Sequence, residues 1–316
     1  MFKNSLDNKR YYTLNCYYKR VFGCKVFKVS LNPGFTCPNK DGKVGTGGCI
    51  YCSPSGSGDF AGNTNDDLMT QFNKVKEVML HKWPNGKYIA YFQANSNTYG
   101  DLDKLKSTYE QFLNVPGVIG ISIATRPDCF TNELYDYLED LNKKTFLTIE
   151  LGLQSSNDET LKYINRGHDL KCFDNCFKEL QKRNIKVIVH IINGLPNETQ
   201  EDMLNTVRYL NSLHIYGIKI HMLHIIKNTK LYSIYKDNPF HVLTEEEYID
   251  TVIKQLELLD EDVIICRITG DPVKEDIVEP KWLVKKFIVL NNIDKEMVKR
   301  DTYQGKYAKK EGRNLD

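Results

Sequence analysis

CPNKDGKVGTGGCIYC, residues 37–52, is the stretch that decides how this chain folds and what it can bind. It places Cys37, Cys49 and Cys52 at the spacing C-x11-C-x2-C. Two cysteines separated by two residues on a tight loop can direct both sulfurs at one metal centre, and a third thiolate completes a tripod of soft donors. Soft sulfur ligands predict either zinc or an iron-sulfur cluster at this loop.

The remaining cysteines and glycines favour the cluster. Nine cysteines, an odd total, and the lack of an apolar leader argue against a secreted disulfide framework and predict a cytoplasmic protein. A structural zinc site needs four ligands, and the nearest further candidates, Cys24 and His81, have no zinc spacing. A [4Fe-4S] cluster on three cysteines leaves one iron open, and the glycines at 42, 45, 47 and 48 let the backbone fold closely around it.

Composition describes a globular chain with unevenly placed charge. The 316 residues are 41% hydrophobic and 27% charged, with a net charge of +2. Residues 1–28 carry a net +6 and residues 281–316 a net +5, so the middle of the chain carries −9. Basic ends with interleaved aromatics suit a polyanion-binding rim, in which Lys299, Arg300, Lys309 and Lys310 would contact phosphates. The alternative is an ordinary solvated, lysine-rich surface.

Strand and helix patterns alternate along the chain. Period-2 or apolar runs predict strands at 25–31, 88–93, 118–124, 146–153, 185–192 and 217–226, and 3.6-residue periodicity predicts helices at 66–81, 103–113, 131–141, 173–181 and 201–212. A further helix over 244–259, a strand over 263–268 and a helix ending near 299 follow. In α/β barrels the loops after the strands build the active site, so a cysteine loop after the first strand fits catalysis.

Several polar residues on or beside these strands need an interpretation. Glu150 interrupts the apolar run FLTIELGL, and a buried carboxylate needs a partner, which makes it a site candidate. His190 is interpreted as a hydrogen-bonded core histidine. His221 and His224, three apart on the strand predicted at 217–226, would face opposite sides. Arg126 and Asp128 follow the third predicted strand. We expect them either to be site residues or to form an ion pair with each other.

The run FKVSLNPGFTCPNKDGKVGTGGCIYC, residues 27–52, resembles the radical S-adenosylmethionine (SAM) enzymes. Their pattern is C-x3-C-x2-C with an aromatic residue before the last cysteine. Tyr51 fills that aromatic place, while the first gap of eleven residues is similar to the branch that includes the elongator catalytic subunit. RITGD (267–271), W-x4-F-x2-LN-x-ID (282–294) and YQGKY (303–307) extend the likeness to YtqA/YhcC-type, MnmL-like proteins over most of the chain.

The resemblance implies an architecture and a set of site residues. It implies an open (β/α)6 TIM-like barrel over 25–235, after a basic segment at 1–24 and before a C-terminal α/β extension at 236–316. Cys37, Cys49 and Cys52 would ligate the cluster. Glu150, in ELGLQS, would hold the SAM ribose hydroxyls and Arg166, in NRGHD, the SAM carboxylate. Asn193 and Gly194 open NGLPNET, which is similar to the family's GLPGET-like turn.

The resemblance also implies an activity. SAM would be cleaved reductively at the cluster to a 5′-deoxyadenosyl radical, with electrons from a donor such as flavodoxin or ferredoxin. The YtqA-like branch is linked to tRNA, where 5-carboxymethylaminomethyl-(2-thio)uridine at the wobble position becomes the 5-aminomethyl form. The alternatives are a radical-SAM enzyme acting on a peptide or small molecule, and a non-catalytic zinc module that binds nucleic acid. An elongator-like acetyltransferase is a third, although no acetyl-CoA domain is evident.

Overall fold

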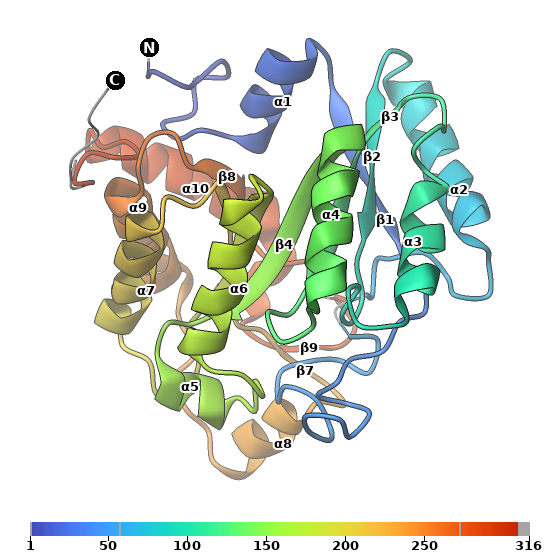
Figure 1. Ribbon diagram of the computed structural model, residues 1–316. Coiled ribbons are helices and arrows are strands. Elements are labelled where there is room, and N and C mark those ends of the chain that lie inside the picture. The colour runs from blue at the N-terminus through green and yellow to red at the C-terminus, as the bar shows by residue number, and fades with distance from the viewer. Residues whose placement is uncertain (1, 57, 272, 309–316) are drawn as a thin grey trace.

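The computed structural model describes residues 2–56, 58–271 and 273–308. Within them, seven parallel strands form one sheet in the order β1-β2-β3-β4-β5-β6-β8, and β7 (Ile225–Ile226) pairs antiparallel with β9 (Ile277–Glu279) beside it (Figure 1). The strands of the sheet are β1 (Val26–Leu31), β2 (Lys87–Phe92), β3 (Val118–Thr125), β4 (Phe146–Gln154), β5 (Lys186–Asn193), β6 (Gly217–Met222) and β8 (Ile264–Arg267). The predicted partial barrel is confirmed, and β8 of the C-terminal extension is its seventh strand.

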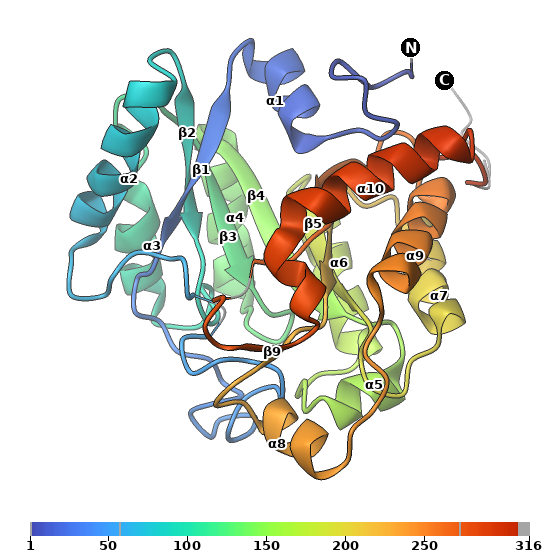
Figure 2. The same ribbon diagram turned by 180° about the vertical axis from the view of Figure 1, so that it is seen from behind.

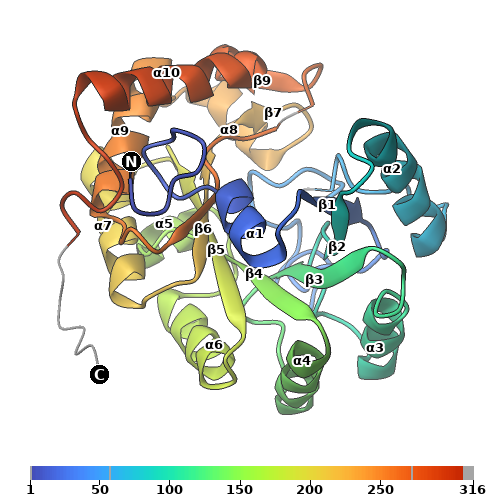
Figure 3. The same ribbon diagram turned by 90° about the horizontal axis from the view of Figure 1, so that it is seen from above.

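Helices cover the outer face of the curved sheet, as the view along the barrel axis shows (Figure 3). The crossover helices are α2 (Leu68–Lys82), α3 (Leu102–Glu110), α4 (Asn132–Lys144), α6 (Leu170–Lys182), α7 (Gln200–Ser212) and α9 (Glu245–Leu258). Two of these helices begin at side-chain caps: the Thr131 side chain accepts from the Leu134 amide, and Thr244 and Glu247 form a capping box. The last helix, α10 (Lys286–Lys299), follows the short 3-10 helix Lys281–Lys285 and packs along α9 (Figure 2).

Contacts across the sheet show how strongly it curls. Lys28 of β1 forms an ion pair with Glu150 of β4, three strands away, and Lys219 of β6 donates to the Tyr91 hydroxyl of β2 at 3.2 Å, four strands away. In a flat sheet, strands three apart lie about 14 Å from each other. These side chains therefore meet in the interior of a sheet that curls like a barrel.

The two faces of the strands differ in character. The outward residues are apolar and pack under the helices in the main core, which includes Ile123 on β3, Ile149 on β4 and Val189 on β5. The alternate, inward positions of the same strands carry polar side chains, among them Glu150 and His190. Side chains alternate between the two faces of a strand, so the same two-residue period gives an apolar outer face and a polar inner face.

The amino ends of the strands are covered by α1 (Leu14–Phe22), which the sequence did not predict as a helix. The Tyr17 ring lies 5.5 Å from that of Tyr216, just before β6, and the Phe22 ring lies 5.2 Å from that of Phe146, the first residue of β4. Two further short helices, α5 (Asp158–Tyr163) and α8 (Lys230–Asp237), were not predicted either and lie at the opposite end, beside the cysteine loop (Figure 1).

One predicted strand is divided in two. The run 217–226 forms β6 up to Met222, and the chain then leaves the sheet, because the neighbouring β5 ends at Asn193. His224 consequently lies in the break between β6 and β7, and not across a single strand from His221. Among the described residues, no helix is long and apolar enough to span a membrane.

Candidate active site at the carboxyl ends of the strands

The cysteine loop follows β1 and is fixed to the two short helices beside it. The Ile50 amide donates to the Ile164 carbonyl at 3.0 Å, just after α5, and the Leu231 amide of α8 donates to the Ile50 carbonyl at 2.8 Å. Gly47 and Gly48 have φ angles of 78° and 74°, in the left-handed region that glycine adopts without strain. The loop therefore lies at the carboxyl ends of the strands, as the sequence predicts.

Positive charge surrounds the second cysteine. Cys37 and Cys49 are buried and Cys52 is half-buried. Nη1 of Arg166 donates to the Cys49 sulfur at 3.6 Å, and Nη1 of Arg126 lies 4.0 Å from the same atom. Burial alone would raise the pKa of the Cys49 thiol, but the charges of Arg166 and Arg126 outweigh it and lower the pKa. The site thus favours a thiolate, the form in which cysteine binds metal.

The Arg166 guanidinium beside this sulfur has a free donor that fits an anionic group. Arg166 is 6% exposed, its Nη2 donates to the Gly152 carbonyl at 2.6 Å, and its Nε has no hydrogen-bond partner in the structure. A Cβ on Gly152 would lie 2.7 Å from Arg166 Nη2, so a larger residue there would clash with the guanidinium. The Asn39 amide group lies beside the same sulfur, and its Oδ1, which can only accept, is buried without a partner. The arginine thus fits a thiolate-bound cluster and a ligand carboxylate, and the asparagine oxygen fits a donor such as a ligand ammonium group.

The arrangement of the three cysteines as cluster ligands stays a proposal. Among the residues the structure describes, no three His, Cys, Asp or Glu side chains converge on a position for a single metal ion.

Arg126 and Asp128 form a two-point ion pair, with N–O distances of 2.9 and 2.7 Å. The mutual ion pair was one of the two alternatives that the sequence left open for these residues.

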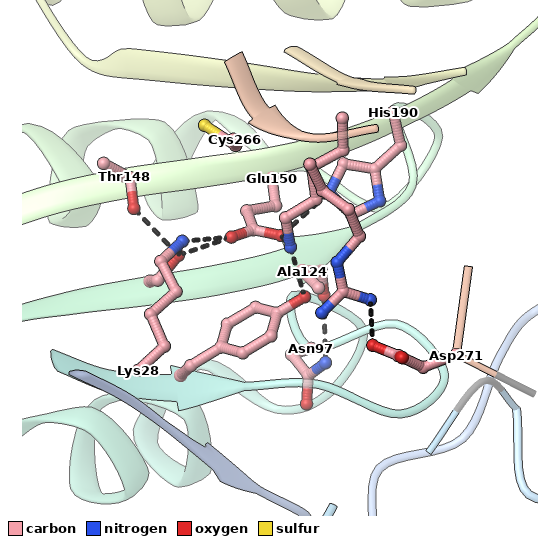
Figure 4. Close-up of polar contacts among 12 residues, drawn as sticks. Lys28, Asn97, Ala124, Thr148, Glu150, His190, Cys266 and Asp271 are labelled. Atoms are coloured by element: carbon pink, nitrogen blue, oxygen red, sulfur yellow. Dashed lines mark hydrogen bonds and ion pairs between the residues drawn. The ribbon is translucent and has the colours of Figure 1, made fainter. Parts of the chain in front are cut away.

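Glu150 lies inside the barrel with four polar partners (Figure 4). One carboxylate oxygen accepts from Lys28 and from the Ser122 hydroxyl, the latter at 3.1 Å, and the other accepts from Lys219 and lies 2.8 Å from His190 Nε2. The expectation that this carboxylate has partners is confirmed, and so is the hydrogen-bonded core position of His190. The ribose contact remains a prediction, since both oxygens are already occupied by protein groups.

The charge states inside the barrel follow from burial and from these contacts. Burial would raise the pKa of Glu150, but Lys219 and Lys28 hold it well below its usual range. Burial, with the charge of Lys219, lowers the pKa of His190 to about 4, and burial with the neighbouring His190 lowers that of His221 well below its usual range. Both histidines are therefore neutral at pH 7, and His190 Nε2–H donates to Glu150.

The other two predicted cofactor residues contact different elements. Asn193 ends β5, and its side-chain amide exchanges two 2.8 Å hydrogen bonds with that of Gln255 on α9. Gly194 has a φ of 82°, and its amide donates to the Met203 sulfur at 3.1 Å. These contacts are with α7 and α9, whereas Arg166 contacts Cys49. A shared role of the four residues in holding SAM stays a prediction.

Sequence reasoning missed the lysines of the barrel interior. In the sequence, Lys28 enters only the charge count of residues 1–28, and Lys219 carries no prediction. A signal is available: the inward positions of β1, β4 and β6 carry polar residues at a spacing of two, namely Lys28 and Ser30, Thr148 and Glu150, and Lys219 and His221. Gln154 was also missed; its Nε2 lies, like Arg166 Nη2, 2.7 Å from where a Cβ of Gly152 would be.

Comparison with known proteins agrees with this geometry. Residues 33–210 match the Radical SAM superfamily and residues 215–299 the Radical_SAM C-terminal domain. The chain is 47% identical over 306 residues to "Uncharacterized protein YtqA" of Bacillus subtilis, covering 97% of this chain and 95% of that one. It is 31% identical over 280 residues to "Protein YhcC" of Escherichia coli, covering 87% and 88%.

More distant relatives include the elongator proteins. "Elongator complex protein 3" of Schizosaccharomyces pombe is 27% identical over 177 residues, 55% of this chain and 32% of that protein. The solved structure of the archaeal Methanocaldococcus infernus Elp3 has a TM-score of 0.65 at 18% identity; the match covers 89% of this chain and 64% of that one, and shows a shared fold. The chain belongs to the radical SAM superfamily, whose members are enzymes that bind a [4Fe-4S] cluster and S-adenosylmethionine.

Proposed function

We propose that this radical-SAM enzyme acts on tRNA, converting 5-carboxymethylaminomethyl-(2-thio)uridine at the wobble position to 5-aminomethyl-(2-thio)uridine. The observation that carries the proposal is the likeness to YtqA over nearly the whole chain, together with the elongator-type spacing of the cysteine loop. The YtqA-like branch that the sequence resembles is linked to this conversion. In this proposal the enzyme works in the cytoplasm with an electron donor such as flavodoxin or ferredoxin.

The residues of the site take roles that their contacts support. When bound, the cluster and SAM supply a 5′-deoxyadenosyl radical that removes a hydrogen atom from the substrate. Cys37, Cys49 and Cys52 would hold the cluster. Arg166, a buried cation with a free Nε–H, would neutralise the Cys49 sulfur and receive the SAM carboxylate.

The surface around the cysteine loop is better placed to meet RNA than the basic chain ends. Lys43 of the loop, Lys162 of α5 and Lys230 of α8 are exposed on three segments that meet at Ile50, and Tyr163, next to Lys162, is 42% exposed. Cations beside an exposed ring can bind phosphates and stack a base.

The described parts of the two chain ends, residues 2–13 and 300–308, lie together at the end of the barrel away from the cysteine loop (Figure 1). The Gln304 amide donates to the Arg10 carbonyl at 2.9 Å. Arg10 pairs with Asp301 of the other chain end at 2.9 Å, and Arg300 pairs with Asp250 of the acidic middle of the chain at 2.7 Å, so part of the basic charge is neutralised. Lys309 and Lys310 lie outside the described residues.

We expect the triple variant Lys43→Ala/Lys162→Ala/Lys230→Ala to bind tRNA more weakly and with a flatter salt dependence. A lysine that neutralises a phosphate displaces counterions from the RNA. With three such contacts removed, fewer counterions are displaced on binding, and the slope of log K against log salt should fall by roughly 2 in magnitude. Filter binding across a salt series measures it, with Lys299→Ala/Arg300→Ala as the matched control. A larger loss in the control would place the RNA at the chain ends.

The substrate itself is tested in cells. In a strain lacking the gene, mass analysis of tRNA nucleosides should show carboxymethylaminomethyluridine accumulating and the aminomethyl forms disappearing. A plasmid copy should restore the profile, and a Cys49→Ala copy should not. An unchanged nucleoside profile in the deletion strain would end the tRNA proposal and leave the family assignment intact.

A further inference from the structure

The interior of the barrel carries more positive than negative charge. Lys28 and Lys219 both pair with the single carboxylate of Glu150, and the two histidines beside them are neutral. We call Lys28, Tyr91, Glu150, His190, Lys219 and His221 the barrel chamber. Two ammonium groups on one carboxylate leave an excess of one positive charge, and burying unbalanced charge is costly for a folded protein.

Glu150 does not compensate its two lysines equally. Burial is the largest cause that lowers the pKa of Lys219 to about 8, against the opposing effect of Glu150, and the charges of Lys28 and Arg267 add to the lowering. For Lys28, burial is outweighed by Glu150 and the pKa is raised. Asp271, the carboxylate next to the chamber, is already paired: it lies 3.4 Å from Arg267 and also pairs with Lys286. A second anion in the chamber would be neutralised by groups that are already in place.

The chamber is reached by solvent. The side chains of Lys28 and His190 are 14% and 17% exposed, whereas that of Glu150 is fully buried. Arg267, at the carboxyl end of β8, is 41% exposed, on the side of the cysteine loop. Because α1 packs against the amino ends of β4 and β6, a ligand would enter from the side on which the proposed cluster lies.

The two lysines can release Glu150 without losing every favourable contact. Nζ of Lys28 lies 5.0 Å from the Tyr91 ring centroid and Nζ of Lys219 lies 4.7 Å from it, so one ring attracts both ammonium groups. A lysine is a point charge on a flexible stem and can turn from one carboxylate to another, which a rigid guanidinium fork does less readily.

We propose that Lys28 and Lys219 form an anion subsite that receives a carboxylate of the substrate inside the barrel, with Glu150 as the counterion that holds both lysines when no substrate is bound. This identification of the ligand rests on the proposed function, since the group removed from the wobble uridine ends in a carboxylate. If this carboxylate binds to Lys28 and Lys219, the carbon atom attached to it lies between the barrel chamber and the cysteine loop.

The subsite is tested with acetate as the probe. In the full chain labelled at histidine, the imidazole resonances of His190 and His221, assigned through His190→Gln and His221→Gln, should shift saturably with acetate and not with acetamide. Lys219→Met should weaken acetate binding about tenfold or more, because a charge-assisted contact is lost. Lys25→Met, which removes a cation bonded to Asn15 outside the barrel, should leave acetate binding unchanged. No saturable shift in the wild type overturns the subsite.

A second variant tests Glu150 as the counterion. Glu150→Gln keeps the shape of the side chain and removes the competing charge, so acetate should bind more tightly than to the wild type. Weaker or unchanged acetate binding in a folded Glu150→Gln protein would overturn that role.

The outcomes separate the subsite from the proposed function. Saturable acetate binding with an unchanged wobble profile in the deletion strain would keep the anion subsite and reject the tRNA substrate. A changed wobble profile without acetate binding, and with normal turnover by Lys219→Met, would keep the tRNA substrate and reject the subsite.

Discussion

Replacing Cys37, Cys49 or Cys52 singly with alanine is expected to abolish the brown colour of the anaerobically purified protein and to reduce its iron from about four atoms per chain to background. Three thiolates are the whole protein ligand set proposed for the cluster, so the loss of one leaves too few donors. Iron analysis and the visible spectrum are the measurements.

Three other cysteines serve as controls. Cys172 of α6 is half-buried and Cys176 lies within the main core, and neither replacement by alanine should change the iron content. Cys129 is the stricter control, because it is buried beside Asp128, next to Arg126, and burial with the charge of Asp128 raises the pKa of its thiol. An intact cluster in Cys49→Ala, or its loss in Cys129→Ala, would require a different ligand set.

The second large effect is expected from Arg166→Ala, which should weaken SAM roughly 10- to 100-fold while the cluster stays in place. The guanidinium is buried against the Cys49 sulfur, and its Nε–H is free to meet a carboxylate; losing one charge-assisted hydrogen bond costs about 1.5–3 kcal/mol. Equilibrium binding of SAM to the reconstituted protein measures it. Arg183→Ala, which removes an arginine paired with Glu179 and Asp136 on the surface, is the matched control.

Glu150 needs a gentler substitution than alanine. Alanine removes the negative charge and also both oxygens that accept from Lys28 and Lys219, and breaking a buried pair in this way typically costs about 3–5 kcal/mol and would obscure any effect on SAM. Glutamine removes the charge as well, but it keeps the shape of the side chain and one oxygen that can accept from a lysine. Glu150→Gln should weaken SAM less than Arg166→Ala, because its oxygens are engaged by protein donors. Unchanged SAM affinity in both variants would make Arg166 and Glu150 structural residues.

Local signals were sufficient for most of the barrel. The strand predicted at 118–124 is Val118–Thr125, the helix predicted at 131–141 is Asn132–Lys144, and the last helix ends at Lys299 as expected. Each of these elements carries its own period. The helices α5 and α8 have only six and eight residues, too few for an apolar period to stand out, and α1, as long as the predicted α3, falls in the basic, aromatic end of the chain that was interpreted as a binding rim.

Contacts between residues that are far apart in the chain could not be predicted from the sequence. That β8 joins the sheet beside β6 depends on the curvature of six preceding strands, and a single strand pattern does not contain that information. Lys28 was grouped with its basic neighbours in the chain, yet its ion pair is with a residue 122 positions away. The cysteine loop was recognisable because its ligands are close in sequence, whereas the barrel chamber combines residues from five strands.

The alternation of side chains along each strand assigns packing and ligand binding to different residues. Val189 and Ile191 pack under the helices, while His190 between them points to the interior. Natural variation or an engineer can therefore exchange the inner residue for another polar one without disturbing the packing that keeps the domain folded. Inserting or deleting a single residue in such a strand would instead turn every side chain to the wrong side. New substrates should thus be reached in this scaffold by point substitutions, and changes of length should be tolerated in the loops.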